Sequence, residues 1–200
     1  MIALVDYGLG NLRSVEKALT AVGAAVCLTS DPEVILSAEK VVLPGVGAFG
    51  QGMVGLRERG LVAAIEEVIT HGSPLLGICL GMQMLFERSE EGGECAGLGA
   101  LPGCAKHFNA PGLKIPQTGW NQIWPTRESA LLRGLAPGAY VYFNHGFYCE
   151  ANDADTLART DYGLNYASVV GRGRVYGIQF HPEKSQHVGL TILRNFVVSN

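Results

Sequence analysis

The sequence has little charge and no long apolar run. Charged residues make up 16% of its 200 residues, the net charge is −3, and no segment is rich in Lys and Arg. We therefore expect no nucleic-acid-binding surface, which needs a basic face. No apolar run approaches the ~18 residues that span a bilayer, and residues 1–6 lack the basic segment of a signal peptide. These absences predict a cytoplasmic protein that binds neither nucleic acid nor membrane.

Paired cysteines are also missing. The five cysteines are odd in number and include no C-x-x-C pair, which argues against a disulfide framework and against a zinc ribbon. A metal site at His181, Glu183 and His187 is conceivable, but metal sites usually have a further close ligand and a clearer spacing. We therefore expect free thiols in a reducing compartment, no metal and no cofactor.

The apolar residues that are present form alternating strand and helix patterns. They make up 48% of the chain, enough for the core of one domain, which we place at residues 1–200. Short apolar runs predict buried strands at 2–7, 25–29, 40–43 and 74–79. Apolar residues at helical spacing predict helices at 11–22, 61–70 and 80–86. This alternation predicts an α/β fold with a mostly parallel sheet and helices on both faces.

The second half of the chain has a different pattern. Residues 87–103 are rich in Gly and Glu and predict an exposed connection. The short runs that follow alternate more, which predicts an antiparallel portion joined to the same sheet. Strands are expected at 105–108, 119–123, 139–143, 155–160, 166–170 and 175–180, and a final helix at 188–198.

Residues 77–81 read Gly-Ile-Cys-Leu-Gly and place a cysteine between a predicted strand and a predicted helix. Glycines two before and two after it permit a sharp turn that exposes the central side chain. Free N–H groups and the helix dipole favour a thiolate at Cys79, and the N–H of Leu80 can stabilise an oxyanion. The alternative is that Cys79 is a small buried residue, as free cysteine often is. The flanking Gly77 and Gly81 favour the nucleophile.

A general acid/base for this nucleophile follows the last predicted strand. His181 lies at the carboxyl end of that strand, where parallel sheets place their active sites. Pro182 turns the chain, so that Glu183 can orient the far ring nitrogen of His181. The alternative is an ordinary surface histidine. The rival histidines have no carboxylate two residues later at a strand exit; they are His71, His107, His145 and His187.

Residues 45–50 match the G-x-G-x-x-G pattern of dinucleotide-binding loops. That pattern belongs after the first strand, with an acidic residue about 20 positions later that closes another strand. Here it follows the third predicted strand, and Glu66 and Glu67 fall within a predicted helix. The sequence therefore favours a flexible loop whose backbone N–H groups face Cys79 over a nucleotide site.

In their chain order, these segments resemble the class I, or triad, glutamine amidotransferases. The cysteine turn and the His-Pro-Glu segment occur throughout that class and identify the chemistry. Narrower motifs are similar to those of the glutaminase subunits of imidazole glycerol phosphate synthase, an enzyme of histidine biosynthesis. The resemblance covers nearly the whole chain and implies the three-layer fold of the class. The matching segments are 6–12, 44–49, 77–83, 114–121 and 181–186.

The resemblance implies a role for each matching residue. It implies a catalytic triad of Cys79, His181 and Glu183. It implies an oxyanion hole at Leu80, Val46 and Gly47. It implies substrate contacts at Gln83, Gly45, Gly146 and Phe147. The family commonly has His-Ser-Tyr where this chain has His-Gly-Phe at 145–147, and that segment holds glutamine largely through its backbone.

The resemblance also implies a partner. Ammonia from glutamine would pass to a (β/α)₈-barrel cyclase subunit in a heterodimer, which makes imidazole glycerol phosphate and an aminoimidazole carboxamide ribotide. Such glutaminases are nearly silent until the partner's site is occupied, and rotation of the Gly45–Val46 peptide is the gate that we expect, because glycine makes it cheap. The residues in family positions near the interface are Asn11, Trp120, Tyr142 and Lys184.

Two alternatives remain open at this point. One is the glutaminase subunit of pyridoxal phosphate synthase, which usually carries a Gly-Gly-Glu-Ser segment that this chain lacks. The other is a catalytically idle homologue that only binds partners. The intact Cys79, His181 and Glu183 argue against the idle homologue, because such proteins often lose a member of the triad.

Overall fold

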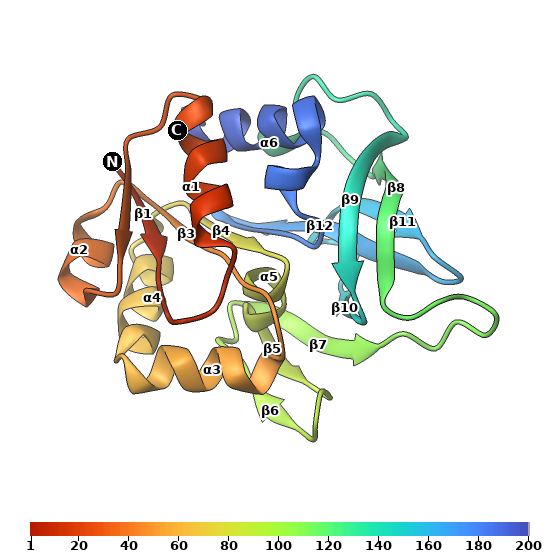
Figure 1. Cartoon of the computed structure of the whole chain (residues 1–200), viewed down its shortest axis with the longest axis horizontal. Helices are drawn as coiled ribbons and strands as arrows, with labels where there is room; N and C mark the ends of the chain where they lie inside the picture. Colours follow the sequence, from red (N-terminus) through yellow and green to blue (C-terminus); the bar gives the residue numbers. More distant parts are fainter. Residues whose placement is uncertain (200) are drawn as a thin grey trace.

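The computed structural model describes residues 1–199, and a nine-stranded sheet forms its centre (Figure 1). The spatial order is β2-β1-β3-β4-β13-β12-β11-β8-β9. The strands from β2 to β13 are parallel, and those from β12 to β9 are antiparallel to their neighbours. The strands are β1 Ile2–Val5, β2 Val26–Thr29, β3 Lys40–Leu43, β4 Leu75–Ile78, β8 Gln117–Pro125, β9 Ala139–His145, β11 Thr156–Asp161, β12 Asn165–Arg172 and β13 Val175–Ile178.

Helices cover both faces of this sheet and enclose a separate apolar core on each side. In Figure 1, α1 (Leu12–Ala21) and α6 (Gln186–Val198) lie above the sheet. Below it lie α3 (Phe49–Glu58) and α4 (Leu61–Thr70), and α2 (Pro32–Ser37), at the left of the view, packs against α4. Among the helices of residues 1–199, none has the length and apolarity to cross a membrane.

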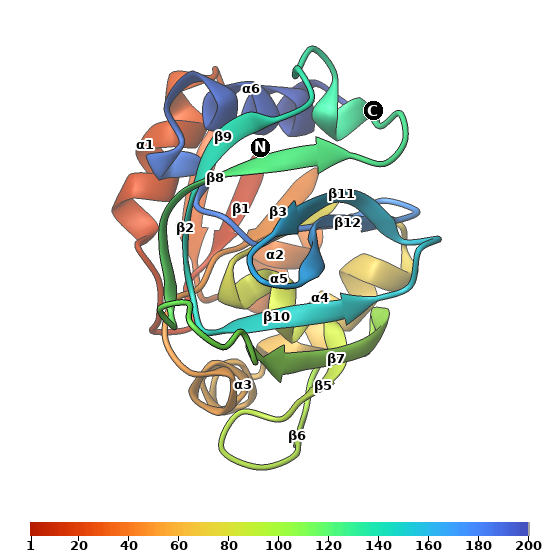
Figure 2. The same cartoon turned by 90° about the vertical axis from the view of Figure 1, so that its right-hand side faces the viewer.

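A second, smaller sheet lies beside the first, with the order β10-β7-β5-β6 (Figure 2). Its strands are β5 Phe86–Ser89, β6 Cys95–Ala96, β7 Leu101–His107 and β10 Phe147–Ala151. The expectation that residues 87–103 form an exposed connection is therefore wrong. Ser89, Leu98 and Leu101 are buried there, but strands this short show no clear alternation in a Gly-rich segment.

Two helices were not anticipated from the sequence, and a third is shorter than expected. The first turn of α2 follows local rules: the Asp31 side chain accepts the N–H of Glu33 at 2.9 Å, and Pro32 begins the helix. In α3, glycines interrupt the helical pattern, yet Gly52 allows close contact with Met84. α5 (Leu80–Met84) ends two residues before the predicted boundary.

The register of the parallel strands sets the position of the candidate site. Leu43 of β3 pairs with Gly77 of β4, and Ile78 of β4 pairs with Ile178 of β13. These three adjacent strands therefore end at almost the same level. The segments that follow them begin side by side at one edge of the sheet.

A glycine pair tests how tightly this edge is packed. We expect Gly81→Ala to lower the free energy of unfolding by about 1–3 kcal/mol or more, because the new methyl group would collide with the backbone oxygen of Leu43. Gly50→Ala is the matched control, since α3 has open space at that position. It should be neutral or stabilise by up to about 1 kcal/mol. Urea unfolding of both variants measures the difference, and equal effects would contradict the packing described here.

Candidate active site

Cys79 occupies a strained turn between β4 and α5. Its backbone has φ 53° and ψ −108°, a positive φ that is rare for a residue with a side chain. The turn closes because Gly77 carries no side chain: a methyl group there would lie 2.7 Å from the carbonyl of Gly81. The N–H of Cys79 donates to the carbonyl of Ile178 at 2.8 Å. Because α5 has only five residues, it contributes free backbone N–H groups at this turn rather than a long helix dipole.

His181 and Glu183 form a buried pair next to this cysteine. Nδ1 of His181 lies 3.0 Å from Oε1 of Glu183, and both side chains are less than 5% exposed. The 3₁₀ turn Pro182–Lys184 returns the carboxylate to the ring, as the sequence predicts. Ser185 fixes the histidine backbone by donating its hydroxyl to the His181 carbonyl at 2.6 Å.

Charge at this pair favours a protonated ring. Burial lowers the pKa of His181, but hydrogen bonds to Cys79 and Glu183 and the negative charges of both outweigh it and raise the pKa to about 10. Oε2 of Glu183 is buried and has no partner within residues 1–199, so the ring is the main neighbour that compensates this carboxylate. The arrangement suits a histidine that carries a proton toward a leaving group.

The loop after β3 lies on the other side of Cys79. Gly45 belongs to this loop and packs against the start of α5: a methyl group on Gly45 would lie 2.8 Å from Cβ of Leu80. Tyr7 supports the loop from below and donates its hydroxyl to the carbonyl of Pro44 at 2.7 Å. Burial, with a smaller effect of the Cys79 charge, raises the pKa of Tyr7 well above its usual value, so this donor stays protonated.

Val46 and Gly47 continue the loop along the wall of a cavity. Their N–H groups donate to no backbone carbonyl within residues 1–199, which leaves them free to stabilise an oxyanion. The sequence also implies a substrate contact at Gly45. In the structure Gly45 packs against Leu80 and Gly81 instead and is not part of the cavity wall.

The cavity beside Cys79 and His181 has a volume of about 330 Å³. Gln83, Gly146 and Phe147, for which the sequence implies substrate contacts, line it. Nε2 of Gln83 donates to the carbonyl of Phe147 at 3.2 Å. The cavity also has a feature that sequence reasoning missed, the carboxylate of Glu91, which accepts the N–H of Phe49 at 2.7 Å. A free ammonium group would pair with this carboxylate.

A second histidine lines the same cavity. Nδ1 of His145 donates to the carbonyl of Phe147 at 2.7 Å, and Nε2 faces the hydroxyl of Tyr166 at 3.3 Å. Burial, only partly opposed by the bond to Phe147, lowers the pKa of His145 to about 4. His145 is therefore neutral at pH 7 and has no carboxylate partner, which distinguishes it from His181.

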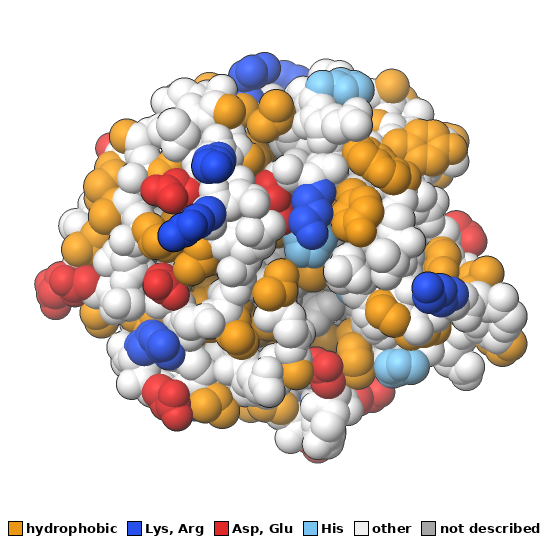
Figure 3. Space-filling view, viewed as in Figure 1, with side chains coloured by type: hydrophobic (Ala, Val, Ile, Leu, Met, Phe, Trp, Pro, Cys, Tyr) orange, Lys and Arg blue, Asp and Glu red, His pale blue; other side chains and the backbone are white. Residues whose placement is uncertain are grey.

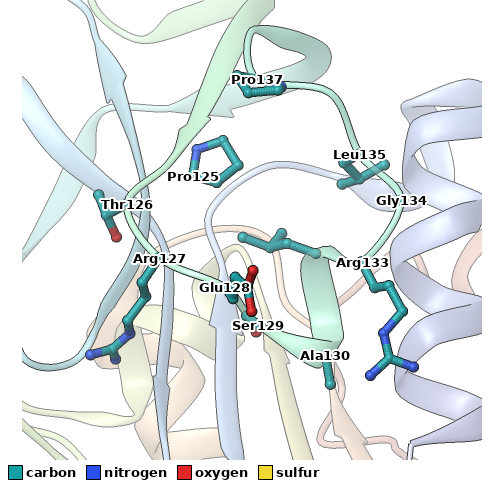
Figure 4. Close-up of a pocket in the computed structure, with 11 residues that line it drawn as sticks. Pro125, Thr126, Arg127, Glu128, Ser129, Ala130, Arg133, Gly134, Leu135 and Pro137 are labelled. Atoms are coloured by element: carbon teal, nitrogen blue, oxygen red, sulfur yellow. The ribbon is translucent and has the colours of Figure 1, made fainter.

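A larger hollow of about 640 Å³ lies elsewhere, at the end of β8 and along the segment that follows it, which includes the 3₁₀ turn Ala130–Leu132 (Figure 4). The side chains of Arg127 and Arg133 point away from each other there. No cysteine or histidine lines it, so it lacks the groups for acyl transfer. Within residues 1–199, no group of three or more His, Cys, Asp or Glu side chains has an arrangement that could hold a metal ion.

Three of the expected interface residues form one group on the surface. Trp120 of β8 pairs with Tyr142 of β9, and their rings meet edge to face at 6.1 Å. Nζ of Lys184 lies 5.5 Å above the Tyr142 ring. Asn11 precedes α1 and caps it without a side-chain hydrogen bond. Within residues 1–199, Asn11 makes no hydrogen bond with any of the other three residues.

The histidine pair makes a pH prediction. In Glu183→Gln, the pKa of His181 should fall by about 1–3 pH units, because an opposite charge is lost. The stability that the imidazolium contributes is complete below about pH 6.5 and is lost as the pH rises toward about 10. The advantage of wild type over the variant should shrink across that interval. NMR titration of the ring and urea unfolding at several pH values test this, and a ring that titrates near 6.5 in wild type would refute it.

Comparison with known proteins places this chain in a family. The model of the family described as "Glutamine amidotransferase class-I" matches residues 3–200. Proteins named imidazole glycerol phosphate synthase subunit HisH are similar over 98% of this chain and 93% of their own length. That of Moorella thermoacetica is 51% identical, and that of Bacillus cereus is 50% identical, over 196 residues.

Solved structures agree at the level of the fold. A crystal structure of a glutamine amidotransferase superposes with a TM-score of 0.77 at 22% identity, over 99% of this chain and 100% of the other. PurLQS from Thermotoga maritima gives 0.76 at 21% identity, over 98% and 96%. The α/β architecture predicted from the sequence is confirmed. The chain belongs to the class I glutamine amidotransferase family and, within it, to the HisH subunits.

Proposed function

We propose that this glutamine-hydrolysing enzyme uses Cys79 as its nucleophile and supplies ammonia to the cyclase of imidazole glycerol phosphate synthase in histidine biosynthesis. The observation that carries the proposal is the Cys79 turn beside the buried pair of His181 and Glu183, at a cavity large enough for an amino acid. The HisH relatives support the pathway.

In the first half of the reaction, the thiolate of Cys79 attacks the side-chain amide carbon of glutamine. The N–H groups of Leu80 and of the loop at Val46 and Gly47 stabilise the oxyanion, at about 3 kcal/mol per donor in comparable sites. The imidazolium of His181 gives its proton to the amide nitrogen. Ammonia leaves, and a thioester to Cys79 remains.

In the second half, His181 is neutral and accepts a proton from water as the water attacks the thioester. The carbon–sulfur bond breaks, which releases glutamate and restores the thiolate beside an imidazolium. Glu183 orients the ring throughout and stabilises its charged form, supported by their 3.0 Å contact. At the other end of the substrate, the carboxylate of Glu91 pairs with the α-ammonium group of glutamine.

A (β/α)₈-barrel cyclase is the proposed partner, in a heterodimer. Hydrophobic side chains gather over β8 and β9 on the face shown in Figure 3. Trp120, Trp124 and Tyr140 of these strands are each about half exposed, and such aromatic residues are typical of interface cores. Occupancy of the cyclase is proposed to act through the Gly45–Val46 peptide. Measuring glutamine hydrolysis with and without the cyclase ligand tests this coupling.

The other readings have less support. The HisH relatives favour this assignment over the glutaminase of pyridoxal phosphate synthase. The family match and the HisH relatives indicate a glutamine-hydrolysing enzyme, which disfavours the catalytically idle homologue. Within residues 45–50, Gly45 packs against Leu80 and Gly81, and Phe49 and Gly50 already belong to α3, which differs from a dinucleotide loop after a first strand.

The nucleophile is tested by Cys79→Ala. Glutamine hydrolysis by the complex should fall by at least about 10⁴-fold, as loss of a covalent nucleophile typically causes. Synthesis from added ammonia should continue, because the cyclase site is untouched. Cys27→Ala is a control with another free cysteine, on β2, and should hydrolyse glutamine normally. A normal rate of glutamate release by Cys79→Ala would exclude Cys79 as the nucleophile.

The proposed interface is tested by Trp120→Ala. Its affinity for the cyclase should fall at least about tenfold, since buried aromatic anchors often contribute 2 kcal/mol or more. Leu28→Ala is the matched control: it changes an exposed apolar residue on β2, at the opposite edge of the sheet. Isothermal titration calorimetry measures both. Equal affinities for the two variants would place the partner on another face.

A further inference from the structure

Gln179 is a buried polar residue that the mechanism above does not use. It follows β13 directly, and the register of β13 and β4 brings it beside Cys79. Its side chain is 0% exposed, and its backbone N–H donates to the carbonyl of Ser168 in β12 at 2.9 Å. Since buried amide groups are costly without partners, the bonds of this side chain show what it does.

The Gln179 side chain connects the nucleophile to the substrate-binding wall. Its Nε2 donates to Sγ of Cys79 at 3.8 Å. Its Oε1 accepts from Nε2 of Gln83 at 3.2 Å, and Nε2 of Gln83 also donates to the carbonyl of Phe147 at 3.2 Å. One hydrogen-bonded chain therefore runs from Phe147 through two glutamines to the reactive sulfur.

The direction of this chain is fixed by chemistry. A backbone carbonyl can only accept, so the amide nitrogen of Gln83 must face Phe147. The same nitrogen donates its second proton toward Gln179, so the oxygen of Gln179 faces Gln83 and its nitrogen faces Cys79. A flipped Gln179 amide would set donor against donor at Gln83 and oxygen against sulfur at Cys79.

We propose that Gln179 is a positioning residue for glutamine hydrolysis, which holds the sulfur of Cys79 with its amide N–H and orients the amide of Gln83. A thiolate accepts this bond more strongly than a neutral thiol, so Gln179 favours the reactive form. Both protons on the Gln83 nitrogen are used, and its Oε1 makes no hydrogen bond within residues 1–199. Oε1 of Gln83 is therefore available to accept a hydrogen bond from the substrate glutamine. The inference rests on the proposed function of the cavity.

The test compares Gln179→Met with Ser168→Ala. Methionine keeps the unbranched shape and removes both hydrogen bonds. Ser168 is buried in the strand next to Gln179, and its hydroxyl has no partner within residues 1–199, so its loss reports general disturbance of the strands. Iodoacetamide alkylation of Cys79 in the full chain is followed against pH, with the Cys79 peptide quantified by mass spectrometry. Thermal unfolding confirms that each variant is folded.

In Gln179→Met we expect Cys79 to be alkylated about tenfold more slowly at pH 7, and the midpoint of the profile to move to higher pH. Ser168→Ala should match wild type. In the complex, kcat for glutamine should fall in Gln179→Met. By contrast, Gln83→Met should chiefly raise KM, because the bond from Gln179 to the sulfur remains. An unchanged alkylation profile in folded Gln179→Met would overturn the inference.

If Gln179→Met does not fold, a measurement on the wild-type chain tests the role of Gln179 instead. The side-chain amide NMR signals of Gln179 should shift as Cys79 ionises and should lose this pH dependence in Cys79→Ala. Gln179 side-chain amide signals whose chemical shifts do not change as Cys79 ionises would overturn the inference. If the alkylation profile moves as expected but wild type with the cyclase does not hydrolyse glutamine, the role of Gln179 at the sulfur is supported and the proposed function fails.

Discussion

The structure depends on the register of three neighbouring parallel strands. β3, β4 and β13 are paired so that Leu43, Gly77 and Gly177 lie level. The chain leaves all three at one edge of the sheet, and each exit supplies a different part of the site: the loop with free N–H groups, the proposed nucleophile Cys79, and the histidine with its carboxylate. A slip of one residue in any pair would turn the side chains to opposite faces, so the same hydrogen bonds that stabilise the sheet also fix the chemistry.

Electrostatics at this edge follow from the burial of its ionisable side chains. His181, Glu183 and Cys79 are all buried, and an isolated charge there would be costly. Together they compensate one another, which keeps His181 charged, while burial keeps His145 neutral in the same cavity, where its ring is bonded to a carbonyl and a tyrosine hydroxyl. Two histidines in one cavity thus have opposite protonation because Cys79 and Glu183 act on only one of them. The larger hollow near Arg127 and Arg133 has volume without this chemistry.

The sequence predicted the parts of the fold that have strong local signals. β3 and α4 have their predicted bounds, since an apolar run and a helical repeat each mark them clearly, and the Cys79 turn is marked by its glycines. The small sheet was missed because β5 and β6 are short and lie in or next to a Gly-rich segment. Glu91 and Gln179 were missed for another reason. Each acts through a partner distant in sequence, Phe49 for one and Gln83 for the other, and pairing of that kind has no periodic signal.

The positive φ of Cys79 has a consequence for the history of such a chain. A non-glycine residue held in this conformation costs about 1–3 kcal/mol, and glycine adopts it freely. Replacement of Cys79 by glycine would therefore relieve this strain, and selection for turnover opposes that replacement. A duplicated copy released from that selection is expected to lose Cys79 early, while its strands, which carry no such strain, persist.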